Sequence, residues 1–194
     1  MKYLFILTSL LCFHFTLYAQ KICVDRMESD GSHQIMTDSK KYKIDDAEYS
    51  ICLKVYETRN TLDWCLVLSS FYYIPRQSEV LLKLGNDSII YLPINNVHVG
   101  KVTLPGSRYV IGSVVSSFPS TEADYYSSLY ALNESDLDNI EKNGIKKIRV
   151  SNGVKYRDKD FPSNSLGKFL NKSRRNIIER LNNPLKKKSL FDDF

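Results

Sequence analysis

Long hydrophobic runs are scarce in this sequence once its first nineteen residues are set aside. Glycine and proline are also few, at 8 and 6 of 194 residues, which excludes collagen-like and linker-like chains. The 4 cysteines are too few for a fold held together mainly by disulfides. Hydrophobic residues make up 43% and charged residues 25%, as in ordinary globular proteins. The composition therefore indicates a folded domain, with no transmembrane span after residue 19.

Metal-binding motifs are also missing. The histidines and cysteines beyond the first nineteen residues form no close Cys-x-x-Cys or His-x-x-x-His pair; they are His33, His98, Cys23, Cys52 and Cys65. Structural zinc sites are built on such spacings. The sequence therefore names no metal ligand and no cofactor-binding residue.

Catalytic motifs are equally absent. There is no Gly-x-Ser-x-Gly elbow, and a Ser/His/Asp arrangement would have to use His33 or His98 as its base. We expect His98 to point outward from a strand, because it alternates with Val97 and Val99. Carboxylates that could pair for glycoside hydrolysis are Asp45, Asp46, Glu48, Glu122 and Asp124. Sequence spacing does not bring any two of them together, so no catalytic residue is assigned and a non-enzymatic protein is favoured.

The N-terminus has the layout of a secretory signal peptide. Met1-Lys2 gives a positive start, Tyr3 to Tyr18 is apolar, and Ala19 is a small residue at the cleavage position. We expect residues 1–19 to be removed, which leaves an extracytoplasmic chain: periplasmic, envelope-associated or secreted. The alternative is an uncleaved anchor, but the run is short for a membrane span and no basic flank follows at once.

Strand signals dominate from Gly31 to about Ser151. Ile51, Leu53 and Val55 alternate with polar or small neighbours, which predicts one buried face. Gly85-Asn86-Asp87 predicts a tight hairpin turn. The expected strands cover residues 49–56, 64–68, 80–84, 89–94, 97–103, 108–117 and 124–132. Because short turns join them, the sheet should be largely antiparallel.

Two helices are expected. Asn133 caps a short helix that ends at Gly144. Residues 163–183 form the longest helix, which Pro184 ends. Its apolar stripe consists of Leu166, Phe169, Leu170, Ser173, Ile177 and Leu181, and its opposite stripe of Lys168, Lys172, Arg175 and Glu179. We expect Leu166, Phe169, Leu170 and Ile177 to be buried.

The predicted fold is a single α+β domain over residues 20–183, followed by a basic and then acidic-aromatic tail over 184–194. It has a mostly antiparallel sheet of six to eight strands, with a short helix and a long C-terminal amphipathic helix packed on it. A partly closed barrel or sandwich, with the helix covering one end, is the alternative.

The register of the hairpin from Ile145 to Tyr156 can be argued from burial. A two-residue Asn152-Gly153 turn would put Ile148 and Val150 on the same face as Lys155 and Arg157. A three-residue loop pairs Val150 with Val154 and makes one face apolar. Since a one-residue slip flips every side chain, the pattern favours the longer loop.

Three cysteines follow the predicted signal peptide. Cys52 and Cys65 lie opposite the apolar faces of neighbouring strands. If Leu53 pairs with Trp64, the two cysteines face each other and a disulfide can form. If Leu53 pairs with Leu66, they are only diagonal neighbours and remain buried thiols. The second register is favoured because it needs a shorter loop, and Cys23 is left over in either case.

A family resemblance emerges from several segments. The leader ending Ala-Gln, the hairpin "LKLGNDSIIYL", the segment "YALNESDLDNIEKNGIKKIRV" and the terminal basic helix resemble uncharacterised secreted proteins of Bacteroidetes. The resemblance covers about the last two-thirds of the chain and implies an exported protein of this fold class. It implies no functional residues. Asp87-Ser88-Ile89 resembles the three-residue O-glycosylation acceptor of such exported proteins, which makes Ser88 a candidate for modification.

Two further features bear on partners. A cluster of tyrosines could stack on sugars or on a partner, although tyrosine also simply suits half-buried strands; it comprises Tyr72, Tyr73, Tyr109, Tyr125, Tyr126 and Tyr130. The formal net charge is +5, and the basic excess lies at Lys168, Lys172, Arg174, Arg175, Arg180 and 186–188. In an exported protein this favours an anionic surface over nucleic acid.

The expected function is therefore a non-enzymatic exported module with a structural or binding role in the cell envelope. The partner would be an envelope protein or an anionic surface. A small hydrolase of envelope glycans is the first alternative, and an inhibitor or partner-binding protein is the second. A large pocket with two acids, or His98 beside a serine and an aspartate, would favour the hydrolase.

Overall fold

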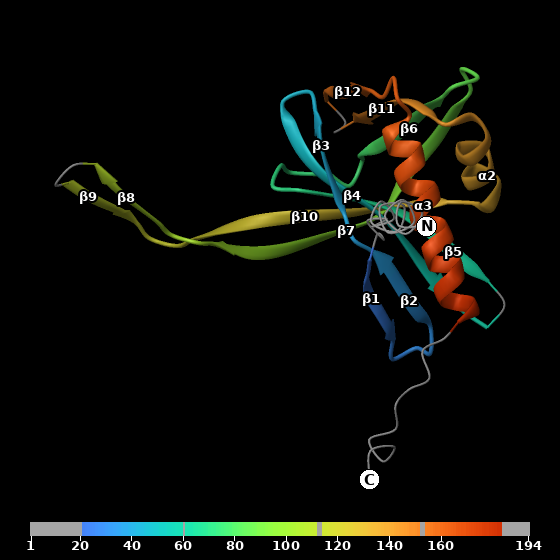
Figure 1. The fold of residues 1–194 in the computed structure, drawn as a ribbon, viewed down its shortest axis with the longest axis horizontal. Coiled ribbons are helices and arrows are strands. Elements are labelled where there is room, and N and C mark those ends of the chain that lie inside the picture. The colour runs from blue at the N-terminus through green and yellow to red at the C-terminus, as the bar shows by residue number, and fades with distance from the viewer. Residues whose placement is uncertain (1–20, 60, 112–113, 152–153, 184–194) are drawn as a thin grey trace, which may run out of the picture.

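The computed structural model describes residues 21–59, 61–111, 114–151 and 154–183, with only the backbone described for residues 107–118. The predicted signal peptide, the tail from residue 184, and Asn152 and Gly153 lie outside the described residues. Figure 1 shows a curved sheet with two helices on one side and a long two-stranded extension on the other. The strands are β1 (Ile22–Met27), β2 (His33–Thr37), β3 (Lys40–Ile44), β4 (Ala47–Glu57), β5 (Leu62–Ser70), β6 (Glu79–Leu84), β7 (Ile89–Leu104), β8 (Ser107–Ile111), β9 (Val114–Phe118), β10 (Thr121–Leu132), β11 (Ile145–Ser151) and β12 (Tyr156–Asp160), and the helices are α2 (Glu134–Asn143) and α3 (Ser165–Asn182).

The main sheet is antiparallel throughout, as predicted, but its ten strands exceed the predicted six to eight. Its order is β1-β2-β4-β5-β10-β7-β6-β11-β12, and β3 pairs with β4 beside β2. β2 and β3 both run antiparallel to β4, along successive parts of it, so they behave as one bent strand. The count is higher because the sequence signal marked neither β1 nor this bent strand as part of the sheet.

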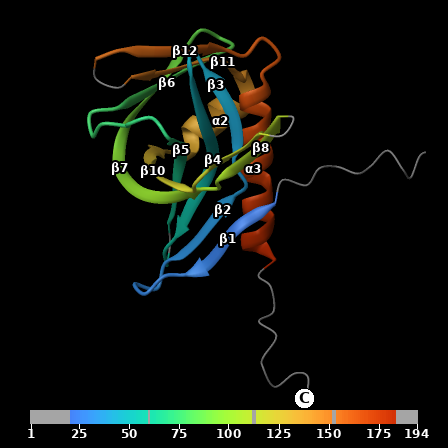
Figure 2. The same cartoon turned by 90° about the vertical axis from the view of Figure 1, so that its left-hand side faces the viewer.

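The two ends of the sheet approach each other through side chains. The Asp158 amide donates to Asp45 Oδ2 at 2.8 Å, and the Tyr42 and Phe161 rings meet edge to face with centroids 5.4 Å apart. Figure 2 shows β12 and β3 near each other at the top of the molecule. No ladder joins β12 to β3 within the described residues, so the sheet stays open.

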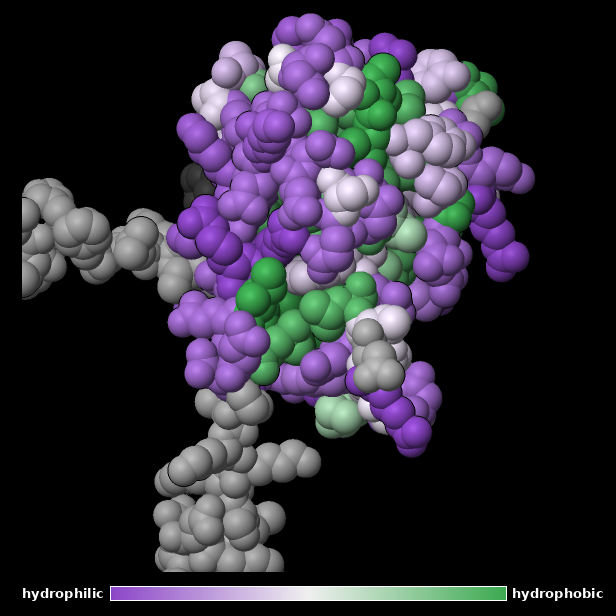
Figure 3. Space-filling view, turned by 90° about the vertical axis from the view of Figure 1, so that its right-hand side faces the viewer, coloured by the Kyte–Doolittle hydropathy of each residue, from purple (hydrophilic) through white to green (hydrophobic). Residues whose placement is uncertain are grey.

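The core lies between the sheet and the two helices. The faces predicted to be buried are buried: Ile51, Leu53 and Val55 of β4 have no exposed surface. Trp64 of β5 and Tyr130 of β10 are the largest side chains enclosed with them. Figure 3 shows mainly hydrophilic side chains on the helix side, with apolar side chains surfacing between them. No helix in the described part of the chain is long and apolar enough to cross a membrane.

The short helix begins and ends where the sequence predicts. Asn133 accepts a hydrogen bond from the Asp136 amide at 2.7 Å, and Asp136 accepts one from the Asn133 amide, which completes a capping box. Gly144 follows with a φ of +69°, a conformation that favours glycine.

The longer helix, α3, buries most of its predicted stripe. Leu166, Leu170 and Ile177 are fully enclosed. Phe169 was predicted to be buried but is only half-buried, because it lies at the margin of the stripe, against Tyr42. Lys172, expected on the solvent side, is also half-buried.

The hairpin of β11 and β12 has neither register considered from the sequence. Ser151 pairs with Tyr156 and Val150 with Arg157, so the predicted pairing of Val150 with Val154 is wrong. The buried side of β11 therefore faces cationic side chains on β12. The edge strand tolerates them because Arg157 reaches Asp46 in the β3–β4 turn at 2.8 Å.

The predicted strands over residues 89–94 and 97–103 are one strand of 16 residues, β7. The predicted strand 108–117 is instead two short strands, β8 and β9, paired as a hairpin. β7 and β10 pair from Ile94 opposite Tyr130 to Leu104 opposite Thr121, with one register shift at Asn95. Together with β8 and β9 they form the extension in Figure 1, which we call the arm (residues 95–128).

Candidate binding surfaces

The arm is a two-stranded ribbon with open edges. β6 pairs with β7 as far as Pro93, and β5 pairs with β10 as far as Tyr126. Beyond these positions no other strand of the described chain pairs with either edge. Each edge therefore presents unpaired backbone N–H and C=O groups, which are a template for an added strand.

The two faces of the arm differ in charge. Lys101, Glu122 and Asp124 lie on one face, where the Lys101 ammonium is 3.5 Å from Glu122. The other face carries His98 and Tyr125 near its root and uncharged residues further out; these are Gly100, Val102, Leu104, Thr121 and Ala123. Val102 and Leu104 are each 39% exposed. A two-stranded ribbon with an uncovered apolar face has little to stabilise it alone.

Aromatic rings support the root of the arm from both faces. Phe71 packs edge to face on Tyr125 with centroids 5.1 Å apart, and Tyr73 packs on Tyr126 at 5.4 Å. Phe71 and Tyr73 belong to the β5–β6 connection and remain 52% and 68% exposed. We call these four residues the aromatic collar. Of the predicted tyrosine cluster, Tyr130 lies apart from it in the core and donates to or accepts from Ser78 at 2.9 Å.

A polar groove lies where β7 leaves the body of the sheet. The register of β7 and β10 shifts there: Tyr130 is opposite Ile94 and Leu129 is opposite Asn96, so Asn95 is the extra residue of a β-bulge. The groove has a volume of about 620 Å³. We call it the amide groove; its lining includes Tyr56, Asp63, Trp64, Asn95, Asn96, His98 and Glu134.

The amide groove does not have the features of a hydrolase site. The groove holds two acids, Asp63 and Glu134. Glu134 accepts hydrogen bonds from Trp64 Nε1 at 2.6 Å and from Arg174, so its role is structural. His98 is exposed, as predicted, and no serine lines the groove. Asp63 is then the one acid in the lining that is left for catalysis, whereas glycoside hydrolysis uses a pair of carboxylates.

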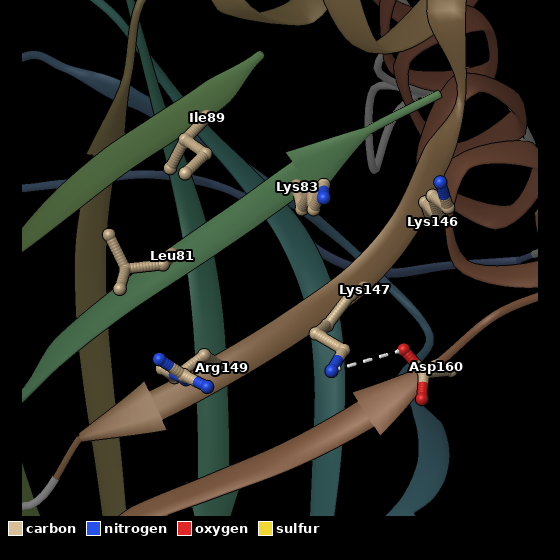
Figure 4. Close-up of a pocket in the computed structure, with 7 residues that line it drawn as sticks. All are labelled: Leu81, Lys83, Ile89, Lys146, Lys147, Arg149 and Asp160. Carbon is tan, nitrogen blue, oxygen red and sulfur yellow. Dashed lines mark ion pairs between the residues drawn. The ribbon is translucent and has the colours of Figure 1, made fainter. Parts of the chain in front are cut away.

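A second groove lies on the outer face of β6 and β11, with a volume of about 420 Å³ (Figure 4). Leu81 and Ile89 form its apolar part, and four cations surround it: Lys83, Lys146, Lys147 and Arg149. Acids neutralise these cations. Lys83 and Lys146 both reach Asp87, Lys147 reaches Asp160 at 3.4 Å, and Arg149 binds Asp158 through two hydrogen bonds of 2.7 Å. An anionic ligand would have to displace these pairs, so this groove is a weak candidate.

β4 and β5 pair in the register in which Cys52 and Cys65 do not face each other. Leu53 lies opposite Leu66 and Cys52 opposite Val67. Cys23, Cys52 and Cys65 are free in the structure, and the disulfide considered for Cys52 and Cys65 is not formed. Burial raises the pKa of the Cys52 thiol to about 12, so this thiol is unreactive at neutral pH.

The other candidate residues are dispersed. Ser88 is exposed in the β6–β7 turn, where its hydroxyl donates to Asn86 Oδ1 at 2.7 Å, and its modification remains a prediction. The carboxylates considered for hydrolysis lie in separate places. Asp45 and Asp46 contact β12, Glu48 pairs with Lys41, and Glu122 and Asp124 lie on the arm.

His33 lies between two carboxylates on neighbouring strands. Its Nε2 is 2.6 Å from Asp25 and its Nδ1 is 3.1 Å from Glu57. Partial burial opposes charge on the ring, but the hydrogen bonds to Asp25 and Glu57 outweigh it and raise the pKa of His33. Within the described residues no group of three histidine, cysteine, aspartate or glutamate side chains could hold a metal ion.

The basic residues of α3 do not form one free surface. Arg174, only 13% exposed, contacts Glu134, Asp138 and Glu141 on α2. Arg180 binds Asp25 on β1. Two of the five cations on this helix therefore form ion pairs within the fold. This weakens the argument that the helix binds an anionic surface. The basic run 186–188 lies outside the described residues.

Sequence reasoning missed the arm and the amide groove. The signal for the arm was present as alternation on both sides of Pro105-Gly106 and Pro119-Ser120, but those breaks suggested separate strands. The groove arises from a bulge, which has no clear sequence signature here. No family model, curated protein or solved structure matches the chain.

Proposed function

We propose that this protein is an exported, non-enzymatic binding module of the cell envelope and that it holds a protein partner through its arm. The observation that carries the proposal is the open edge of β7 beyond Pro93. This edge runs for ten residues, from Asn95 to Leu104, without proline and without an acidic side chain. The partner contributes an extended strand that adds to this edge and satisfies its backbone groups.

The aromatic collar supports this role. Exposed aromatic side chains beside an open strand edge supply the apolar contact area that dominates protein interfaces. Phe71 and Tyr73 are exposed next to the root of the arm while their rings contact Tyr125 and Tyr126. The collar belongs to β10 and the β5–β6 connection, so it adds apolar contact area at the root of the arm, one strand away from the open edge of β7.

The test compares the intact mature chain with an arm-truncated variant. Val99 and Tyr126 are directly paired, so residues 100–125 can be replaced by Asn-Gly, which closes a two-residue hairpin. All ladder pairs between β5 and β10 are retained, since they begin at Tyr126. Thermal unfolding should show that the body of the variant still folds.

Both proteins are then crosslinked in envelope fractions of the source cells, and captured proteins are identified by mass spectrometry. The intact chain should capture a defined partner through residues of β7, and the truncated chain should not. Capture of the same partner by the truncated chain would refute the role of the arm. N-terminal sequencing of the exported chain should begin at Gln20, and retention of residues 1–19 would refute the exported, soluble form.

A further inference from the structure

The amide groove exposes neutral hydrogen-bonding groups above an apolar floor. Asn95, Asn96 and His98 of β7 are all exposed along its wall. The floor includes Cys65 and Leu129, which are 4% and 6% exposed. Tyr56 adds aromatic surface, and the enclosed Trp64 lies beneath the groove. Carboxamide and imidazole groups can each donate and accept hydrogen bonds, as hydroxyl groups require.

The bulge at Asn95 explains why these groups face the groove together. A β-bulge leaves one residue without a partner, bends its strand and redirects the neighbouring side chains. Two consecutive asparagines at that position, Asn95 and Asn96, stand where β7 begins to diverge from the body. At about 620 Å³ the groove has the size of a site for a small ligand.

The lining of the groove offers little charge to a ligand, and a lysine placed beside it, Lys54, has its ammonium over the Tyr56 ring, 4.3 Å from the centroid. No lysine or arginine is among the side chains that line it. One of its two carboxylates, that of Glu134, is already neutralised by Arg174. The other, Asp63, is exposed and can accept hydrogen bonds from hydroxyl groups. The lining is therefore suited to an uncharged ligand rich in hydroxyl groups.

We infer that the amide groove binds a neutral oligosaccharide. Asn95, Asn96 and His98 bond its hydroxyl groups, and the apolar floor with Tyr56 contacts its less polar ring faces. The sugar would contact the side chains of Asn95, Asn96 and His98, whereas the partner strand proposed above would pair with the backbone of the same stretch of β7, so sugar binding does not require that partner.

The sole tryptophan of the chain provides the assay. Trp64 is 1% exposed, but it borders the groove from beneath, and its Nε1 donates to Glu134, which lines the groove. The mature, full-length protein is titrated with uncharged hexasaccharides of glucose, mannose and N-acetylglucosamine while tryptophan emission is recorded. At least one should give a saturable change with a Kd below about 1 mM.

Variants locate the binding. Asn95→Ala combined with His98→Ala should weaken binding by about tenfold or more, because two exposed hydrogen-bonding groups are lost. Asn139→Ala, an exposed asparagine on α2 outside the groove, is the matched control and should leave the Kd unchanged. Thermal unfolding checks that all variants fold.

Three results would overturn the inference: no saturable change with any of the three sugars, an unchanged Kd in the double variant, or a response only to an uncharged decapeptide of valine, threonine and serine. The last would assign the groove to a peptide. The arm-truncated variant retains Asn95, Asn96 and His98 and should still bind the sugar. Failure of the arm to capture a partner is therefore distinguishable from failure of the groove to bind a sugar.

Discussion

Gly144 and Gly167 show how single residues set the packing of the helices on the sheet. A Cβ at Gly144 would lie 2.3 Å from the Asn164 side chain, and one at Gly167 would lie 2.1 Å from Asn164 Oδ1. The same oxygen accepts a hydrogen bond from the Ile145 amide at 2.7 Å. Asn164 therefore joins the end of α2, the start of β11 and the first turn of α3, and only glycine leaves room for it.

Gly144→Ala should destabilise the protein by about 1–3 kcal/mol, because alanine resists the positive φ and displaces Asn164. Gly31→Ala is the matched control: Gly31 has a φ of +83°, but a Cβ there would meet no atom within 4 Å. Denaturant unfolding of both variants separates the cost of backbone conformation from the cost of crowding. Equal losses in the two variants would show that Asn164 moves aside freely.

His33 makes the stability dependent on pH. Its pKa is raised in the folded protein, so the bound proton stabilises the fold below the ordinary value of about 6.5. This contribution is lost as the pH rises through the raised pKa. His33→Gln should therefore lose more stability at pH 5.5 than at pH 9, by up to about 1 kcal/mol after allowance for solvent screening.

Urea unfolding at the two pH values measures this difference. The charged ring can donate hydrogen bonds to both Asp25 and Glu57. If His33→Gln costs the same stability at both pH values, the ring is not charged when it binds these two carboxylates.

At the scale of elements, one arginine connects the two helices. Arg174 of α3 is mostly enclosed and reaches Glu134, Asp138 and Glu141 on α2. Glu134 also accepts the indole hydrogen of Trp64 at 2.6 Å. The orientation of α2 thus depends on a polar network that extends from α3 to the core tryptophan of β5.

Arg174→Ala should destabilise the protein by about 1–2 kcal/mol and shift the emission of Trp64, because Glu134 loses its cation. Arg175→Ala is the control, since Arg175 is exposed and, among the described residues, its guanidinium donates a hydrogen bond to the Asn171 carbonyl of its own helix and forms no ion pair. Its effect should stay within about 0.5 kcal/mol. A larger loss for Arg175 than for Arg174 would contradict the assigned orientation of α3.

At the scale of the whole molecule, the arm and the body should differ in stability. Residues of β4 such as Ile51 and Leu53 lie in the centre of the sheet and are fully buried. Within the described residues, 100–104 and 121–125 have no strand partners other than each other. The arm should therefore open without unfolding the body.

Hydrogen exchange monitored by mass spectrometry tests this expectation. Arm amides should exchange roughly 100-fold faster than those of β4, or more, in the isolated chain. Addition of the captured partner should slow exchange along β7. Equal protection of the arm and β4 in the isolated chain would mean that the arm already has a partner, such as a second copy.

Much of the fold could be predicted because its signals are local. The alternation of Ile51, Leu53 and Val55 marks a buried face wherever the strand lies, and Asn133 and Gly144 mark the ends of α2 through their own backbone preferences. The largely antiparallel sheet followed from short turns between strands.

The rest depended on residues far apart in the chain. The open edge of β7 exists because β6 begins only at Glu79, opposite Pro93, while β7 continues to Leu104. Arg157 can lie opposite the buried Val150 only because Asp46 approaches from another hairpin. The sequence by itself determined which faces are apolar and where α2 begins and ends. Only the tertiary structure decided strand register, the arm and the amide groove, because pairing between strands is set by whichever distant segment satisfies their backbone groups and charges.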